Sequence, residues 1–265
     1  MDTVTQPKLS IITINLNNAS GLCKTIESVV NQTFTDYEYL IIDGGSTDNS
    51  VGIIKDYADK LTYWVSEPDK GIYRAMNKGI LLAKGDYCLF LNSGDWLLNE
   101  NIIEKVFSLD YNDDLICCKV FNHKSYGTGS IQLPKDKLTF YDFYAATLAH
   151  QSTFIKTRLL IDNGLYDEKL TIVADWKFFM EVVIIQRCSY ITLDIETTYF
   201  SNGGISSAFG NVTNKERELV LNKYFSPYID DYKLLHSYKS SRVIRLWEKL
   251  KDNILVLSIY KFFVH

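Results

Sequence analysis

The segment Asp86-Tyr-Cys-Leu-Phe-Leu-Asn-Ser-Gly-Asp-Trp96 joins a short apolar run to a polar turn that carries the carboxylate of Asp95. Such a run is typical of a buried parallel strand, and open α/β sheets bind ligands beyond the carboxyl ends of these strands. Asp95 therefore has two interpretations. It faces a ligand at that edge of the sheet, or it belongs with Asn92 and Ser93 to a turn that caps the next helix. This segment alone leaves both open.

The sequence around this segment alternates between strand and helix signals from Lys8 to about Val120. The pattern predicts strands at residues 9–16, 39–43, 63–65, 87–92 and 115–120, and helices at 20–30, 48–60, 71–83 and 100–108, the first of them capped by Ser20. Regular alternation predicts an α/β fold with a mostly parallel sheet flanked by helices.

Beyond Val120 the alternation loosens. The aromatic stretch 140–144 is expected to cover a site, residues 175–185 are expected to form a helix, and the glycine-containing stretch 199–207 is expected to be a loop. Asp175 falls in the first turn of the expected helix. It acts on a ligand, or it caps that helix and complements its dipole.

The C-terminal stretch 233–261 is basic, with seven Lys and Arg against two acidic residues, which leaves about −9 for the rest of a chain of net charge −4. Apolar residues recur there at helical spacing and predict a basic amphipathic helix. Such a helix lies on an anionic membrane surface, or it packs its apolar face against its own domain. The sequence favours neither.

Composition narrows the class of protein. A net charge of −4 argues against nucleic acid as the main partner. The five cysteines form no CxxC pair, which indicates a reducing compartment. The polar residues 1–8 lack the apolar core of a secretory signal, and no apolar run is long enough to span a bilayer. We expect a cytoplasmic protein, which under the membrane interpretation of its C-terminal helix contacts the inner face of the membrane peripherally. The sequence does not fix its oligomeric state.

Four predicted strands end in polar side chains, in the stretches 13–17, 43–48, 67–71 and 92–95. Carboxylates there can accept hydrogen bonds from a base or a ribose, and glycines let the backbone approach a flat ligand. The combination suggests a nucleotide. No GxGxxG or GxxxxGK[ST] motif follows a strand, so a divalent cation, Mn²⁺ or Mg²⁺, is the expected means of holding a diphosphate, with Asp95 as its ligand.

Four motifs between Lys8 and Ser207 together resemble the family 2 inverting glycosyltransferases. They are Ser10-Ile-Ile-Thr-Ile-Asn15, Ile42-Asp-Gly-Gly-Ser-Thr-Asp48, Ser66-Glu-Pro-Asp-Lys-Gly-Ile-Tyr73 with Ala75, Asn77 and Gly79, and Phe90-Leu-Asn-Ser-Gly-Asp95. The resemblance implies a GT-A-like, nucleotide-sugar-binding fold. It also implies a catalytic domain over residues 1–210, with a nucleotide-binding half at about 8–120 and an acceptor half at about 121–210, before a helical extension at 211–265.

The resemblance also assigns expected roles. Thr13 and Asp43 contact the base, Asp69 and Lys70 lie near the base and the ribose, and the turn 92–95 holds the ribose and the metal. The full expected nucleotide set is Thr13, Asn15, Asp43, Gly44, Asp69, Lys70, Asn92 and Ser93. A common form of the metal motif is Asp-x-Asp-Asp, whereas this chain has Asn92 and Gly94 at the first two acidic positions, so we expect fewer carboxylates on the cation. Met76 replaces an Arg of many relatives, which removes one phosphate contact.

The family's base is an acidic residue at the start of a helix in the second half of the domain, and Asp175 matches that position. His150 is expected to contact a phosphate, the metal or the acceptor. Trp176 either stacks on a sugar or fills the core. Gly203 and Gly204 resemble a loop that closes over the donor.

These expectations amount to an inverting hexosyl- or hexosaminyltransferase that moves a sugar from a nucleotide donor, with UDP expected, to a glycan or polyprenyl-linked glycan of the capsule or O-antigen type. The alternatives are a sugar-nucleotide nucleotidyltransferase, which normally carries a glycine-rich basic segment that residues 8–19 lack, and a non-catalytic nucleotide-sugar-binding scaffold.

Overall fold

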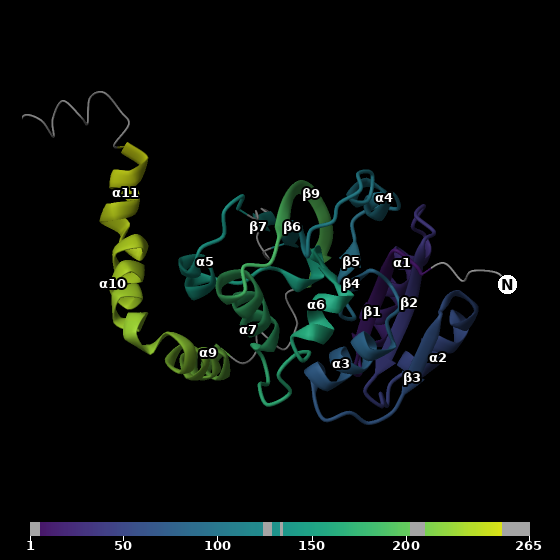
Figure 1. Ribbon diagram of the computed structural model, residues 1–265. Coiled ribbons are helices and arrows are strands. Elements are labelled where there is room, and N and C mark those ends of the chain that lie inside the picture. Colours follow the sequence, from purple (N-terminus) through teal and green to yellow (C-terminus); the bar gives the residue numbers. More distant parts are fainter. Residues whose placement is uncertain (1–5, 124–128, 133–134, 202–209, 251–265) are drawn as a thin grey trace, which may run out of the picture. The chain divides into compact units, whose positions relative to one another are not determined.

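A computed structural model describes residues 6–123, 129–132, 135–201 and 210–250 (Figure 1). The chain separates into two compact units, Met1–Arg217 and Glu218–His265. The boundary expected near residue 210 between a catalytic domain and an extension stays a prediction. Within the described ranges, no helix is long and apolar enough to cross a membrane.

The first unit is built on a mixed sheet whose strands run in the order β3-β2-β1-β4-β8-β6-β9-β5, with β7 paired to β6. The strands are β1 Leu9–Asn15, β2 Tyr37–Asp43, β3 Tyr63–Ser66, β4 Tyr87–Phe90, β5 Trp96–Leu97, β6 Leu115–His123, β7 Gly129–Gln132, β8 Thr153–Lys156 and β9 Tyr190–Phe200. Strands β1 to β4 pair in parallel with one another, and β6 is parallel to β9. The predicted α/β class with a mostly parallel sheet is confirmed.

The helices of the described chain are α1 Ala19–Val30, α2 Ser50–Asp56, α3 Ile72–Leu82, α4 Ile102–Val106, α5 Phe140–Ala145, α6 Thr157–Asp162, α7 Ala174–Met180, α9 Gly210–Phe225, α10 Ile229–Ser240 and α11 Arg242–Leu250. Short turns of other helix types are η1 Ala58–Lys60, η2 His150–Ser152, η3 Glu181–Ile185, which is a π-helix, and η4 Ser226–Tyr228. The helix expected at 175–185 is confirmed as α7 continued by η3.

The central strands are apolar on both faces because helices cover both. Side chains alternate along a strand, so Leu9 and Ile11 of β1 join a core with α1, α2 and α4, whereas Ile12 points to the opposite face. There α3 packs so closely that a Cβ on Gly79 would lie 2.5 Å from Ile12 Cγ2. This double cover explains why the sequence showed continuous apolar runs and no alternation.

Several sequence predictions need correction. Helix α1 is capped by Asn18, whose side chain accepts a hydrogen bond from the Gly21 N–H, and not by Ser20, which lies inside the helix. Strand β4 ends at Phe90 and not at 92. The helix predicted over 48–60 ends at Asp56, and η1 follows it. The loop expected over 199–207 is wrong at its start, because Tyr199 and Phe200 belong to β9, which pairs with β5 and β6. Residues 202–207 lie outside the described residues.

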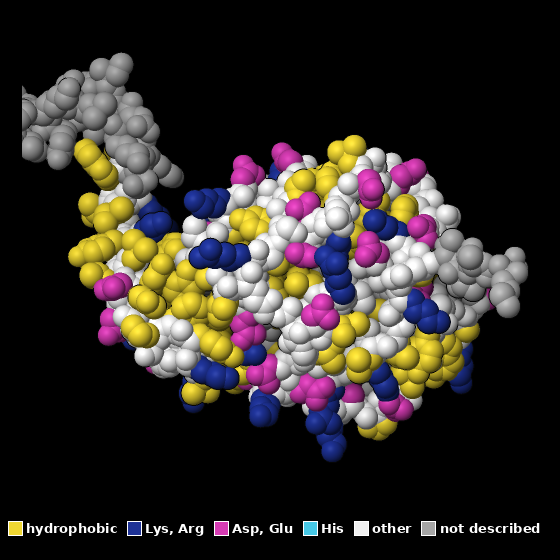
Figure 2. All heavy atoms as spheres, viewed as in Figure 1, with side chains coloured by type: hydrophobic (Ala, Val, Ile, Leu, Met, Phe, Trp, Pro, Cys, Tyr) yellow, Lys and Arg dark blue, Asp and Glu magenta, His cyan; other side chains and the backbone are white. Residues whose placement is uncertain are grey.

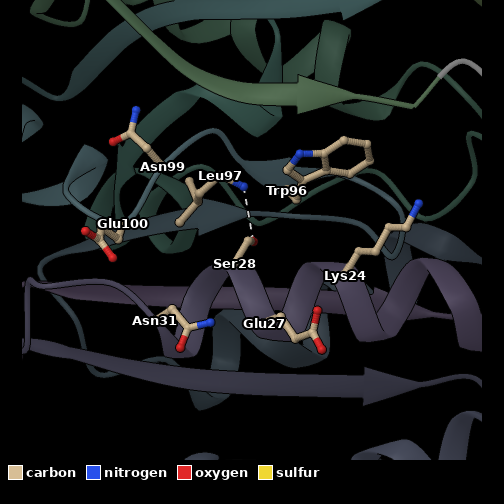
Figure 3. Close-up of a pocket in the computed structure, with 8 residues that line it drawn as sticks. All are labelled: Lys24, Glu27, Ser28, Asn31, Trp96, Leu97, Asn99 and Glu100. Atoms are coloured by element: carbon tan, nitrogen blue, oxygen red, sulfur yellow. Dashed lines mark hydrogen bonds between the residues drawn. The ribbon is translucent and has the colours of Figure 1, made fainter.

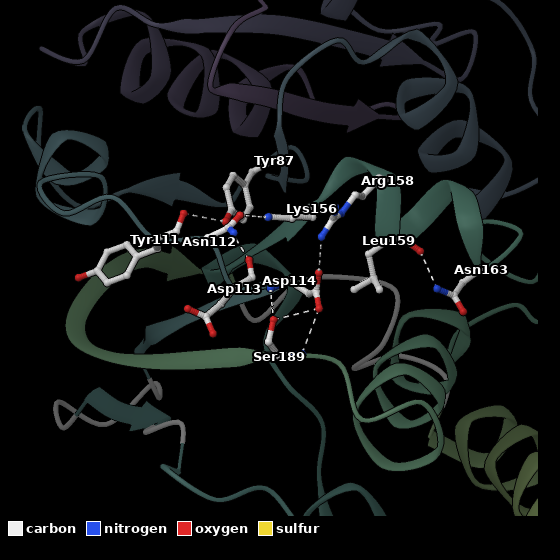
Figure 4. A network of polar contacts seen from close by, with 10 residues as sticks. All are labelled: Tyr87, Tyr111, Asn112, Asp113, Asp114, Lys156, Arg158, Leu159, Asn163 and Ser189. Atoms are coloured by element: carbon white, nitrogen blue, oxygen red, sulfur yellow. Dashed lines mark hydrogen bonds and ion pairs between the residues drawn. The ribbon is translucent and has the colours of Figure 1, made fainter.

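The sequence also missed an inserted strand. Strand β8 lies between β4 and β6 and is antiparallel to both. Near the C-terminal end of β8, Asp114 accepts hydrogen bonds from the Ser189 backbone N–H at 3.0 Å and from Arg158 at 3.3 Å (Figure 4). This network joins the amino ends of β6 and β9 to the start of α6. It therefore holds together the edge of the sheet opposite the strand ends where the site was predicted.

In the second unit, the single helix expected over 233–261 is interrupted. Helix α10 ends at Ser240, and Ser241 has an extended ψ of 132° before α11 begins. Val243 and Leu246 on α11 are exposed, and Figure 2 shows hydrophobic side chains along α10 and α11. The aromatic end of the predicted helix, at 260–263, lies outside the described residues.

Candidate active site

The four polar strand ends meet at one edge of the sheet. In the parallel register, Asn15 of β1 lies opposite Asp43 of β2, and Asp43 lies opposite Ser66 of β3. On the other side of β1, the Ser93 N–H donates to the carbonyl of Ile14 at 3.0 Å. The predicted convergence of these stretches therefore holds in the folded chain. We call this edge the crevice.

Asp43 organises one wall of the crevice. Its side chain is fully buried and accepts hydrogen bonds from Asn15 Nδ2 at 2.7 Å, Ser66 Oγ at 2.6 Å, and both the backbone and hydroxyl of Ser46. Burial opposes ionisation, but these hydrogen bonds outweigh it and hold the pKa of the carboxyl below its ordinary value. Two carboxylate oxygens accept about four hydrogen bonds, so a direct contact with a base requires a serine to give one up.

The two candidate residues on β1, Thr13 and Asn15, also form hydrogen bonds within the protein. Thr13 is fully buried, and its hydroxyl lies 2.9 Å from the Tyr39 hydroxyl. Asn15 Nδ2 donates hydrogen bonds to Asp43 and Ser46, but the buried Oδ1 of Asn15 has no hydrogen-bond partner within the described chain. Buried polar oxygens are normally paired, so the Asn15 oxygen is an acceptor for a ligand donor.

The loops after β2 and β3 pack backbone against backbone. A Cβ on Gly44 would lie 2.7 Å from Asp69 Oδ2, and one on Gly45, whose φ is +80°, would lie 2.9 Å from the Pro68 nitrogen. Asp69 itself accepts the Gly71 N–H at 3.1 Å, which shapes the start of α3, and Lys70 is exposed. At Gly45 glycine is needed, because a Cβ there would meet the backbone of the facing loop and its φ is positive.

The turn 92–95 is tied to α1. Asn18 Nδ2 donates to the Ser93 carbonyl at 2.7 Å, and the Thr25 hydroxyl accepts the Gly94 N–H and donates to the Asp95 carbonyl. Gly94 has φ +105°, which glycine adopts readily. The capping interpretation is right in part: the segment is a turn, but Asp95 does not cap the next helix, because α4 begins at Ile102 after its N-cap Asn101. The ligand interpretation stays a prediction.

The carboxyl of Asp95 is buried with few partners. It is 4% exposed and accepts one backbone N–H, from Ser201, at 3.0 Å. Burial raises its pKa to about 6, and the Ser201 hydrogen bond and the nearby His150 counteract this only in part. A hard divalent cation completed by phosphate oxygens and waters would relieve this burial, so the Asp95 carboxylate suits the expected metal. No group of three or more His, Cys, Asp or Glu suited to a metal occurs among the residues described.

Asp175, at the start of α7, faces the same crevice from the second half of the unit. His150 Nδ1 lies 2.9 Å from its Oδ2, and the Tyr73 hydroxyl donates to its Oδ1 at 2.9 Å. Burial opposes its charge, but the hydrogen bond and charge of His150, with Tyr73, hold the pKa of Asp175 below its ordinary value. The same pairing outweighs burial for His150 and raises its pKa. A carboxylate kept ionised in this way can accept a proton.

His150 connects this carboxylate to the turn after β4. Its Nε2 lies 3.3 Å from Asn92 Nδ2. With Nδ1–H donating to Asp175 and Nε2 accepting from Asn92, a neutral ring satisfies both contacts, a tautomer assigned from the network. The buried Oδ1 of Asn92 then lacks a donor among the described residues, like that of Asn15.

Trp176 does not face the crevice. It is 1% exposed, its indole N–H donates to the Phe143 carbonyl at 2.7 Å, and the Arg217 guanidinium lies 4.9 Å from the ring centroid. The core alternative therefore describes Trp176, and stacking on a sugar does not. Gly203 and Gly204 lie outside the described residues.

Sequence reasoning missed two contributors to the site, Asn18 and Tyr73. Asn18 was recognisable as a helix N-cap, because Asn precedes the first apolar-periodic residues. Tyr73 was quoted within a motif but had no local sign of its role, since its partner Asp175 lies 102 residues away.

A hollow of about 370 Å³ lies apart from the crevice, between α1 and the segment after β5 (Figure 3). It is lined by Lys24, Glu27, Ser28, Asn31, Trp96, Leu97, Asn99 and Glu100. It includes none of the polar strand ends. The chemistry at the crevice therefore rests on hydrogen-bond geometry, and not on the volume of a hollow.

Comparison with known proteins agrees with this architecture. Residues 10–170 match the family described as "Glycosyl transferase family 2", and the chain belongs to that family of glycosyltransferases. It is 31% identical over 206 residues to an uncharacterized glycosyltransferase of Mycobacterium tuberculosis, covering 76% of this chain and 78% of that protein. It is 28% identical over 211 residues to a PGL/p-HBAD biosynthesis glycosyltransferase of Mycobacterium bovis, covering 76% and 80%.

Two solved structures share the GT-A fold. Staphylococcus aureus TarS 1–349 in complex with UDP superposes with a TM-score of 0.61 at 22% identity, covering 73% of this chain and 60% of that one. The mannosyltransferase PcManGT from Pyrobaculum calidifontis in complex with GDP-Man and Mn²⁺ gives 0.63 at 13% identity, covering 83% and 64%. The present chain thus spans about 60% of the length of that TarS fragment.

Proposed function

We propose that this glycosyltransferase is inverting, uses a UDP-sugar with Mn²⁺ or Mg²⁺, and transfers the sugar to a hydroxyl of a glycan or lipid-linked glycan. The observation that carries the proposal is a pair of carboxylates at one crevice: Asp175 is joined through His150 to Asn92, and Asn92 begins the turn that carries Asp95. The solved relatives support the donor class, since TarS was crystallised with UDP-GlcNAc and PcManGT with GDP-Man and Mn²⁺.

The nucleotide would be held in part by acceptor oxygens that receive no hydrogen bond within the described protein. The Oδ1 atoms of Asn15 and Asn92 are buried acceptors without partners in the described residues, at the carboxyl ends of neighbouring strands. A base N–H and ribose hydroxyls are suitable donors. Asp69 and Lys70, on the loop after β3, are expected to complete the contacts. Asp43 and Thr13 act by holding this wall in shape, with a base contact of Asp43 as the remaining prediction.

In the transfer step, the acceptor oxygen attacks the anomeric carbon from the face opposite the diphosphate. The bond from that carbon to the diphosphate oxygen breaks, and its electron pair leaves with the nucleoside diphosphate. The acceptor proton moves to Asp175, whose lowered pKa keeps it ionised and able to receive the proton near neutral pH. His150 orients the carboxylate through its Nδ1 contact and stabilises the ionised form of Asp175, and the same pairing raises the pKa of His150.

A divalent cation, when bound at Asp95, would supply charge stabilisation on the departing diphosphate. The chain's own contribution is the buried carboxylate and the turn that fixes it. Thr25 and Asn18 hold the turn to α1, so the carboxylate direction is set before any ligand binds.

The second unit supports a peripheral membrane contact and a lipid-linked acceptor. On α11, Val243 is 75% exposed and Leu246 is 58% exposed, and Arg242 and Arg245 lie on the same helix. Exposed apolar side chains with interspersed Arg are typical of helices that lie in an anionic lipid interface. Loss of binding to vesicles containing anionic lipid, after truncation at Ser237, tests this part of the proposal. Binding that survives the truncation would contradict it.

The central test is calorimetric titration of UDP, GDP and dTDP into the protein, each with Mn²⁺ and with EDTA. We expect metal-dependent binding of UDP in the wild type and weak, metal-independent binding in the Asp95→Asn variant. An Asp113→Asn variant is the control, because it changes a half-buried carboxylate that precedes the amino end of β6, whereas the crevice lies at the carboxyl ends of the strands. Absence of binding to all three nucleotides would contradict the proposed function.

A further inference from the structure

Tyr73 contacts the proposed base from an element that belongs to the nucleotide half. It lies in the first turn of α3, directly after the loop 67–71, and is 5% exposed. Its single O–H proton is shared between two acceptors, Asp175 Oδ1 at 2.9 Å and the carbonyl of Ile172 at 2.6 Å. Since His150 holds Oδ2, the two oxygens of Asp175 are held from two separate elements.

We propose that Tyr73 is a positioning residue that fixes the carboxylate of Asp175 and couples its orientation to the donor-binding loop through helix α3. This inference rests on the proposed function, because it assumes that Asp175 is the base. The Trp176 backbone N–H also donates to this carboxyl, and the two side-chain donors, His150 and Tyr73, hold one oxygen each and so fix its plane. Two carboxylate oxygens accept about four hydrogen bonds, so a lone pair remains for the acceptor hydroxyl.

Helix α3 is joined to the segment before Asp175 at further points. Asn77 Nδ2 donates to the Tyr166 carbonyl at 2.9 Å, and its Oδ1 accepts the Tyr166 N–H at 3.0 Å. Arg74 pairs with Glu168 at 3.1 Å. The loop that leads to Asp175 therefore follows α3, and α3 begins at the donor loop. A shift of the donor loop would be transmitted to the base.

The phenol of Tyr73 is suited to donate and not to ionise. Burial and the charge of Asp175 keep its pKa well above the ordinary value, so the O–H stays protonated at all pH values of interest. The groups that face Asp175 are Tyr73, His150, Tyr166 and Arg217. Of the two tyrosines, Tyr73 alone donates to the carboxylate in the contacts described.

Tyr166 provides a matched control. Its ring centroid lies 5.7 Å from that of Tyr73, and it is 2% exposed. Its buried hydroxyl has no hydrogen-bond partner in the part of the chain that the structure covers. Removing either hydroxyl deletes one oxygen from the same aromatic cluster, but only Tyr73→Phe removes a donor from Asp175.

The experiment compares Tyr73→Phe, Tyr166→Phe and Asp175→Asn in hydrolysis of the UDP-sugar, measured as UDP release with water as acceptor. We expect Tyr73→Phe to lower kcat about tenfold with the donor KM unchanged, as for the loss of one hydrogen bond to a charged group. The acid limb of its pH profile should move to higher pH, because the ionised form of Asp175 loses a donor. Tyr166→Phe should match the wild type in both respects.

Equal kcat and pH profiles for the two Phe variants would overturn the positioning role. Turnover that survives Asp175→Asn would instead overturn the base assignment, so the two failures are distinguishable. UDP titration of each variant shows that the crevice is folded. If Tyr73→Phe loses UDP binding, Tyr73→His, which restores an N–H donor, must recover turnover, and a failure to do so would also overturn the proposal.

Discussion

Asp43 ends strand β2 and Asp95 follows strand β4, and these two strands lie on either side of β1 at the same crevice. Both residues are buried, yet their surroundings act in opposite directions. Neutral donors from three residues surround Asp43 and lower its pKa. Asp95 has one backbone donor in the described structure, and burial raises its pKa to about 6. The difference teaches that burial alone does not mark a functional carboxylate. A buried carboxylate whose hydrogen bonds are incomplete is the better candidate for ligand binding, because a complete set leaves no acceptor position for a ligand.

The largest effect should come from removing Asp43. Asp43→Ala leaves the buried donors of Asn15, Ser46 and Ser66 without their acceptor, and we expect a loss of about 3 kcal/mol in the free energy of unfolding. Urea denaturation at pH 7 measures it. Asp95→Ala should cost clearly less, and an equal or larger cost would break the comparison.

The second prediction concerns how the ionisation of Asp95 changes the free energy of unfolding with pH. Its folded pKa of about 6 lies above the unfolded value of about 4, so the native state binds more protons in this interval and stability falls as pH rises from 4 to 6. Asp95→Asn should remove this fall and, at pH 7 without metal, should stabilise the fold by about 2 kcal/mol. For Asp43, whose folded pKa is lowered, stability should instead be lost as pH decreases through its titration.

Parallel pH series of unfolding for wild type and Asp95→Asn provide the check. Other groups titrate in the same interval, so the difference between the two curves is the relevant quantity. Mn²⁺ with UDP should raise the Tm of the wild type at pH 7 and leave that of Asp95→Asn nearly unchanged. A variant that responds to Mn²⁺ like the wild type would place the cation elsewhere.

The glycines between the two loops should give a smaller effect. Gly45→Ala strains a residue at φ +80° against the Pro68 backbone, so we expect a loss of about 1 to 2 kcal/mol. The matched variant Gly44→Ala meets only the end of the Asp69 side chain, which can move. It should leave stability within about 0.5 kcal/mol of the wild type while weakening UDP binding through Asp69. Thermal unfolding and calorimetry separate the two.

The family, the fold class and the convergence of the polar strand ends followed from the sequence. The parallel strands β1 to β4 were recognisable because double burial produces continuous apolar runs. Strand β8 escaped prediction because its four residues, Thr153–Lys156, are too short for a periodic signal and pair with strands distant along the chain. The cap of α1 was misplaced by two residues because Asn18 and Ser20 are both good cap residues, and only the backbone angles distinguish them.

The roles within the crevice divide in the same way. Local motifs were enough to identify Asp43, Asp95 and Asp175 as candidates, because residue type, strand ends and helix starts are short-range features of the chain. They did not distinguish Asp43, whose carboxylate has a full set of hydrogen bonds, from Asp95, whose buried carboxylate accepts one. Nor did they reveal that Tyr73 contacts Asp175, 102 residues away in the sequence. Hydrogen-bond completeness and burial depend on groups that approach only when the chain has folded, and for that reason the three-dimensional arrangement was needed to assign them.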